Sequence, residues 1–170
     1  RTCLMEVHGC LGGVWTAGAI AWIIDAKDKT GIMQELTEEL DARGVKAGPV
    51  GPKTSFAYDV EEMKLLLDEK CVEAGVRIRL HSRVVGVAKD GNTLSHVLTE
   101  SKSGREAWAA RVIIDTTGDG DVASLAGCGY DVGHPETGDT QPMSLMALIT
   151  GVRFEEIEPF VAGGGAEPKA

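Results

Sequence analysis

The spacing of apolar residues predicts two amphipathic helices in the first half of the chain. The first covers Lys29–Arg43, and Gly44 is suited to end it. Its apolar face consists of Ile32, Met33, Leu36 and Leu40. The second follows Asp59, a residue type that caps helix N-termini, with Glu62 as its partner in a capping box. Its apolar stripe, which ends before Gly75, consists of Val60, Met63, Leu66, Leu67 and Val72.

Short alternating and continuous apolar runs predict strands around these helices. The segment Thr2–Glu6 is expected to be a short strand that ends in an acid, and Val76–Leu80 alternates as a half-buried strand does. A β-meander is expected over about 83–111, with a hairpin turn at Asp90-Gly91-Asn92. The continuous run Val112–Asp115 predicts a strand that is buried on both faces.

Composition narrows the class of protein. The 170 residues suffice for one domain, with 43% hydrophobic and 25% charged residues, as in an ordinary globular protein. A net charge of −9 disfavours nucleic acid as a partner, because an acidic surface repels phosphate. No run reaches the ~20 apolar residues that span a bilayer, so we expect no membrane partner. Four cysteines without a CxxC pair favour reduced thiols and a cytoplasmic location, and they favour no metal site.

Glycine is the residue type that departs most from average usage. The chain has 22 glycines, well above the ~7% average, and they are clustered rather than periodic. Clustered glycine indicates close backbone approach or positive φ at defined places. One cluster coincides with prolines in Ala47–Ser55, which we expect to be a loop.

The first segment with candidate chemistry is Glu6 and the glycine-rich stretch after it. An acid at the end of a strand in a doubly wound sheet can accept hydrogen bonds from ribose hydroxyls. Gly12 and Gly13 would then let the backbone pass close to a ligand. Taken alone, the pattern also fits a surface glutamate before a turn.

The second segment runs from the apolar stretch at 113–114 through Thr-Thr-Gly-Asp-Gly-Asp into a short helix, Val122–Ala126. Ligands of open α/β sheets bind beyond the carboxyl ends of strands, and Gly118 and Gly120 allow that approach. Asp119 and Asp121 suit sugar hydroxyls, a helix cap or a metal-bridged water. An EF-hand would need more acids and a terminal glutamate.

A third segment contains Val84 and Val85, which enter the expected meander. A backbone N–H and C=O at this place could bind the edge of an adenine. Two valines in the core explain the pattern equally well.

Together these segments resemble the FAD-dependent oxidoreductases of the two-dinucleotide-binding-domain group. The resemblance rests on Cys10-Leu11-Gly12-Gly13, on Ile114–Asp121, and on Gln141–Met146, and it extends from Leu4 to about Val152. It implies an α/β protein with a Rossmann-like FAD-binding domain that carries an inserted β-meander. The implied cofactor is FAD, and the implied activity is two-electron redox chemistry at a flavin on a small organic substrate.

The resemblance also implies roles for individual residues. Glu6 corresponds to the acid that binds the adenosine ribose, Gly12 and Gly13 to the loop along the pyrophosphate and flavin, and Val84 to the adenine contact. The stretch that closes over FAD corresponds to Thr117, Gly118 and Asp119, followed by Asp121 at the start of the next helix. Thr116 replaces the usual alanine.

The family's Gly-x-Gly-x-x-Gly phosphate loop is expected ~20 residues before Glu6, upstream of this chain. We therefore expect a partial FAD-binding domain over 1–140, without its first βα unit, and the start of a substrate-side region over 141–170. As a fragment, the chain alone is expected to bind FAD poorly and to be inactive, because the phosphate loop is the main anchor of the pyrophosphate.

The catalytic residues stay open. The candidate bases by residue type are His8, His81, His96 and His134, of which His134 is favoured by its place after the second motif. A covalent flavin link at His8 and a redox role for Cys10 are conceivable, although a packed thiol is favoured. Alternatives to the enzyme are a non-catalytic nucleotide-binding module and an acidic Ca²⁺-binding structural domain. An NAD-binding dehydrogenase would leave the second motif unexplained, and homo-oligomerisation is left open.

Overall fold

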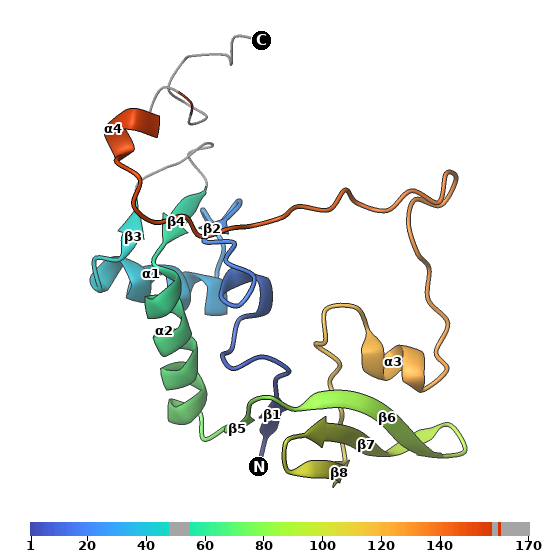
Figure 1. The fold of residues 1–170 in the computed structure, drawn as a ribbon. Helices are drawn as coiled ribbons and strands as arrows, with labels where there is room; N and C mark the ends of the chain where they lie inside the picture. Colours follow the sequence, from blue (N-terminus) through green and yellow to red (C-terminus); the bar gives the residue numbers. More distant parts are fainter. Residues whose placement is uncertain (48–54, 158–159, 161–170) are drawn as a thin grey trace. The chain divides into compact units, whose positions relative to one another are not determined.

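The computed structural model describes residues 1–47, 55–157 and 160. By its contacts the chain divides into two compact units. The β-unit consists of Arg1–Gly9 and Val76–Ser144, and the helical unit consists of Cys10–Gly75 and Leu145–Ala170. Figure 1 shows the elements of each unit with their labels.

The β-unit begins with a pair of parallel strands, β1 (Cys3–Met5) and β5 (Arg77–Arg79). Both strands were expected from the sequence. Their pairing continues past the strand ends, because the Glu6 N–H donates to the Arg79 carbonyl at 2.9 Å and the Ser82 N–H donates to the Glu6 carbonyl at 2.9 Å. The carboxyl ends of β1 and β5 are therefore tied together.

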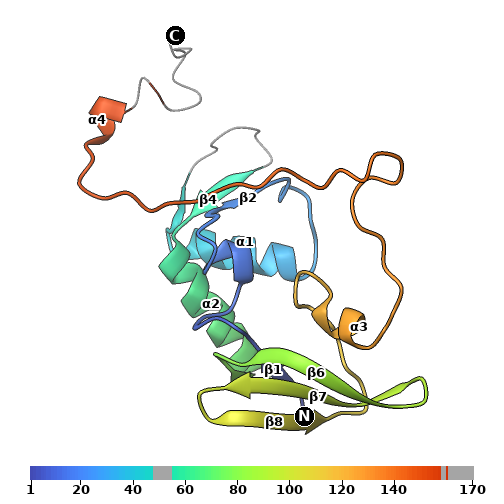
Figure 2. The same cartoon turned by 45° about the vertical axis from the view of Figure 1, so that its right-hand side comes forward.

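The expected meander forms a three-stranded antiparallel sheet in chain order: β6 (Arg83–Asp90), β7 (Thr93–Ser101) and β8 (Gly104–Ala109). Its first turn is the two-residue hairpin Gly91-Asn92, which closes between Asp90 and Thr93 as predicted. Helix α3 (Asp121–Leu125) lies beside β6 (Figures 1 and 2), and the Lys89 ammonium donates to the Ala126 carbonyl at 2.6 Å.

The prediction of a strand over Val112–Asp115 is wrong. The segment has no regular secondary structure and belongs to none of the sheets that the described residues form. The side chains of Val112 and Ile114 are 74% and 79% exposed. A continuous apolar run forms a buried strand only where neighbouring strands and a covering layer exist. No described element supplies them here, so this apolar run does not form a buried strand.

The helical unit is built on two packed helices, α1 (Ile32–Ala42) and α2 (Val60–Glu73), both close to their predicted bounds (Figure 2). A small antiparallel sheet accompanies them, with strands in the order β2 (Trp22–Ile23), β4 (Phe56–Tyr58) and β3 (Lys46–Ala47). The remaining described elements are the 3₁₀ turn η1 (Gly13–Trp15) and the short helix α4 (Phe154–Ile157). The loop expected at Ala47–Ser55 falls largely outside the described residues, and Ala47 itself belongs to β3.

The core of the helical unit lies where α1 and α2 meet this sheet. Leu40, Met63 and Leu66 are almost fully buried there. Tyr58 packs against the same cluster, and its hydroxyl oxygen lies 2.9 Å and 3.0 Å from the carbonyl oxygens of Trp15 and Ile20. Burial raises the pKa of Tyr58 to about 12.

Three details of the helix predictions are wrong. The N-cap at Asp59 is confirmed, but Glu62 does not complete a capping box. The Asp59 N–H already donates to the Val45 carbonyl at 3.1 Å, and the Glu62 carboxylate lies 3.6 Å from the Arg43 guanidinium. Val72 is 68% exposed, because nine residues after Met63 are about two and a half helical turns, which places it on the opposite face. Ile32, the first residue of α1, is 75% exposed because no described side chain covers that end.

In the described parts of the chain, no helix is both long enough and apolar enough to cross a bilayer.

Candidate functional site

The acid Glu6 stands at the carboxyl end of β1, directly after Met5. Its side-chain Oε1 accepts the His8 N–H at 2.8 Å, which folds Glu6–His8 into a tight turn. The His8 carbonyl in turn accepts the His81 N–H at 3.0 Å. These bonds fix one carboxylate oxygen of a half-exposed acid at the end of the parallel pair. A carboxylate in this position offers acceptors to a hydroxyl-bearing ligand.

The second predicted motif folds into a turn that Asp115 organises. Asp115 Oδ1 accepts from the Thr117 N–H at 3.1 Å and from the Thr117 hydroxyl at 2.8 Å. Its Oδ2 accepts from the Ala123 N–H at 2.9 Å, in the first turn of α3. The Thr117 oxygen accepts from the Asp121 N–H at 2.7 Å. One aspartate and one threonine therefore connect the start of the turn to the start of α3.

The hydrogen bonds to Asp115 favour its charged form. Desolvation raises the pKa of this carboxyl, but bonds from the Ala123 N–H, the Thr117 hydroxyl and N–H and the Val122 N–H outweigh it. Together they hold the pKa of Asp115 below its ordinary value. Asp115 was not among the predicted site residues. An aspartate two positions before a threonine and close to a glycine pair is a signal for such a turn.

The glycines of this turn present open backbone. Gly118 has a φ of 89° and Gly120 a φ of 70°, and a Cβ atom added to either would meet nothing within 4 Å. Asp119 is exposed between them, and Asp121 is the first residue of α3. Thr117 contributes its hydroxyl to the network above, so it supports the turn from within. The turn is therefore rigidly held on one side and accessible on the other.

The glycine pair of the first motif belongs to the helical unit, and its two members differ. A Cβ atom on Gly12 would lie 2.7 Å from Thr16 side-chain atoms and 2.8 Å from Leu67 Cδ1. Gly12 is therefore needed for packing inside the unit. Gly13, with a φ of 53°, would meet nothing within 4 Å. Only Gly13 leaves room for a ligand along the backbone.

Val84 lies in β6 opposite Thr99 and is half-buried. The ladder is irregular directly after it, and Val85 falls in this bulge with 37% of its surface exposed. Bulges re-aim side chains and interrupt backbone pairing. The structure thus places Glu6, Val84 and the residues Thr117–Asp121 in the β-unit.

The other candidate residues are less constrained. His134 is exposed, and its Nδ1 accepts the Glu136 N–H at 3.2 Å. His96 lies in β7, and its Nδ1 is 3.1 Å from the Ser95 hydroxyl. The Cys10 thiol is half-buried, 3.8 Å from the Thr16 hydroxyl. Within the described residues, no three His, Cys, Asp or Glu side chains form a group that could hold a metal ion, so the Ca²⁺ alternative gains no support.

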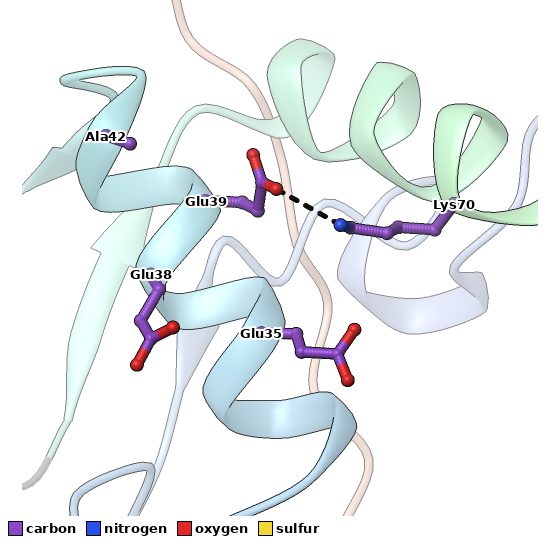
Figure 3. A pocket seen from close by; sticks show the side chains of 5 residues that line it. All are labelled: Glu35, Glu38, Glu39, Ala42 and Lys70. Carbon is purple, nitrogen blue, oxygen red and sulfur yellow. Dashed lines mark hydrogen bonds and ion pairs between the residues drawn. The ribbon is translucent and has the colours of Figure 1, made fainter. Parts of the chain in front are cut away.

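A shallow pocket of about 280 Å³ lies between α1 and α2 (Figure 3). Three acids of α1, Glu35, Glu38 and Glu39, make its lining acidic. Ala42 of α1 and Lys70 of α2 complete the lining. The Lys70 ammonium donates to Glu39 at 3.1 Å. This hydrogen bond is the main reason why the pKa of Lys70 lies above its ordinary value. None of the predicted cofactor residues lines this pocket, and its charge does not suit a phosphate-bearing ligand.

Comparison with known proteins gives the family. A model of the FAD dependent oxidoreductase family matches residues 1–167. The chain belongs to this family. A search of the curated proteins finds no match. Family membership confirms the expected resemblance to the FAD-dependent oxidoreductases.

The chain is also similar to two solved structures. The crystal structure of THI4 from Thermovibrio ammonificans has a TM-score of 0.52 at 20% identity, over 78% of this chain and 56% of that one. A triple mutant of the flavin-dependent brominase Bmp2 has a TM-score of 0.47 at 20% identity, over 64% of this chain and 31% of that one. The similarity to THI4 supports a mixed α/β fold for this chain. The chain spans little more than half of the THI4 length.

Proposed function

We propose that this chain supplies the adenosine-side part of an FAD-binding site in an oxidoreductase that performs two-electron chemistry on a small organic substrate. In this proposal, 1–140 forms part of a Rossmann-like domain with the antiparallel sheet β6–β8 as an insertion, and 141–170 begins the substrate-side region. Family membership supports the cofactor, and the geometry of the β-unit supports the role of individual residues.

The observation that carries the proposal is the arrangement of Glu6. Its carboxylate stands at the carboxyl end of a parallel strand pair, where α/β proteins bind nucleotides. The His8 N–H fixes Oε1 at 2.8 Å, so the carboxylate is oriented before any ligand arrives. An oriented acceptor suits the paired hydroxyls of a ribose. We propose that Glu6 binds the adenosine ribose of FAD.

The turn held by Asp115 fits the second contact region. Gly118 and Gly120 leave open backbone on the side away from the Asp115 network, as a turn that closes over a cofactor requires. We propose that Thr117, Gly118 and Asp119 approach the cofactor, with Asp121 at the start of α3. Val84 would present its backbone to the adenine, and Gly13 its open side to the ligand. Gly12 acts by packing against Thr16 and Leu67.

The flavin, when bound, supplies the acceptor and donor of two electrons. The residues of this chain bind and orient the cofactor by the carboxylate of Glu6 and by the open glycine backbone.

The test is FAD binding to the full-length gene product, measured by flavin absorbance and by titration. Glu6→Gln retains the size of the side chain but removes the charge, and it should weaken FAD binding by about 1–3 kcal/mol, because ribose hydroxyls lose a charged acceptor. The matched control is Glu136→Gln, an exposed acid in a loop of the same unit.

Wild-type protein that stays colourless and does not bind added FAD would refute the proposed cofactor. Equal FAD affinity of wild type and Glu6→Gln would refute the ribose role while leaving the family assignment intact.

A further inference from the structure

His81 has an unusual backbone for a residue with a side chain. It follows β5, and its φ of 51° lies in the left-handed region. Histidine adopts this region more readily than most residues, but the conformation still persists only where the surroundings hold it. The His81 N–H is bonded to the His8 carbonyl at 3.0 Å, which supplies part of that restraint.

The imidazole ring of His81 provides the second restraint. A Cβ atom added to Gly9 would lie 2.9 Å from His81 Cε1 and 3.0 Å from Nε2. The ring edge thus occupies the space that a side chain at position 9 would need. Gly9 does not have a positive φ, so its lack of a side chain serves this contact rather than a backbone conformation.

These contacts connect His81 to the Glu6 carboxylate through His8. The His8 N–H donates to Glu6 Oε1 at 2.8 Å, and the His8 carbonyl accepts from His81 at 3.0 Å. His81 therefore restrains His8, the residue whose N–H orients the Glu6 carboxylate. It does so through its hydrogen bond to the His8 carbonyl and through the contact of its ring with Gly9. All these residues belong to the β-unit.

We infer that His81 is a positioning residue for the adenosine end of the cofactor site, acting through His8 and Gly9 on the Glu6 carboxylate. The inference rests on the proposed function. His81 does not need to touch the cofactor, because its effect is to restrict the turn Glu6–Gly9 to the conformation that binds. Restricting a binding loop in advance increases affinity by reducing the entropy lost on binding.

The experiment is a double-mutant cycle on FAD affinity in the full-length protein, with His81→Gly, Gly9→Ala and the double variant. His81→Gly removes the ring and tolerates the positive φ, and Gly9→Ala pushes the ring away. Each single variant should raise the Kd for FAD by about fivefold. The double variant should be no weaker than the single variants, because both changes break the same contact. His96→Gln, on β7 of the same unit, is the control.

Two further readouts separate positioning from a purely structural role. The Tm of the cofactor-free protein should stay unchanged in His81→Gly, and the affinity for FMN, which lacks adenosine, should stay at the wild-type value. His81→Asn, which also tolerates a positive φ, should reproduce the loss of FAD affinity if His81→Gly does not fold.

Unchanged FAD affinity in the His81 variants would overturn the inference and leave the proposed function standing. So would multiplicative losses in the double variant, or a weaker affinity that is matched by an equal loss for FMN. A wild-type protein that binds no FAD would instead overturn the proposed function and this inference together.

Discussion

At the scale of single residues, Asp115 shows how one side chain determines a turn. It accepts hydrogen bonds from Thr117 and from Ala123, and these bonds lower its pKa. A group with a lowered pKa in the folded state stabilises the fold above its unfolded pKa of about 3.9. That contribution is lost as the pH falls through the lower, folded value. The Asp115 carboxylate therefore stabilises the fold most at neutral pH.

Asp115→Asn should accordingly destabilise the protein at pH 7, because an amide cannot accept bonds at both of its ends. The difference from wild type should shrink as the pH falls below the unfolded pKa of about 3.9 and vanish as the pH falls through the lower, folded pKa of Asp115. Chemical denaturation across this pH range measures the effect. Asp119→Asn is the matched control, since no hydrogen bond to the Asp119 carboxylate exists within the described residues. A stability difference that is independent of pH would contradict the account.

Residue-level prediction from the sequence succeeded where the chemistry is local. Asp59 was identified as a cap from its type and from the apolar stripe that follows it. Asp115 was missed because its role depends on hydrogen bonds to Ala123, eight positions away. The packing role of Gly12 depends on Leu67, more than fifty positions along the chain, and no local pattern reveals it.

At the scale of elements, α2 depends on its N-terminal cap. The Asp59 carboxylate accepts the N–H groups of Glu61 and Glu62 at 2.8 Å and 3.2 Å. These are two of the free donors at the start of the helix. Met63 and Leu66, which anchor the core, lie within the first two turns, so fraying at this end would expose them.

Asp59→Ala should therefore lower the free energy of unfolding by about 0.5–2 kcal/mol, as loss of an N-cap does elsewhere. Asp59→Ser retains a capping oxygen and should recover most of that loss. Urea denaturation followed by circular dichroism measures both variants. Equal destabilisation by alanine and serine would show that the carboxylate acts otherwise than as a cap.

Elements with short-range signals were predicted well, and those that need distant partners were not. The turns of the meander β6–β8 have clear sequence signals. Its strands were confirmed at nearly the expected bounds. The apolar run Val112–Asp115 has a strand-like composition, but a strand exists only through its hydrogen-bonded neighbours. Composition carries no information on whether those neighbours are present.

At the scale of the whole molecule, the chain consists of two units with distinct structures. The β-unit contains Glu6, Val84 and the turn organised by Asp115, and the helical unit contains the glycine pair. The family was predicted from motifs that lie in both units, and the match over residues 1–167 confirms it. The expected boundary between 140 and 141 stays a prediction, as do the roles of the individual cofactor residues.

The most direct test of the central claim is the structure of the full-length protein with FAD bound. We predict that a Glu6 carboxylate oxygen lies at about 2.5–3.0 Å from a hydroxyl of the adenosine ribose, as hydrogen-bonded oxygens do. We also predict that the turn Thr117–Asp121 contacts the same FAD molecule. An FAD bound elsewhere, with Glu6 facing only solvent, would contradict the account.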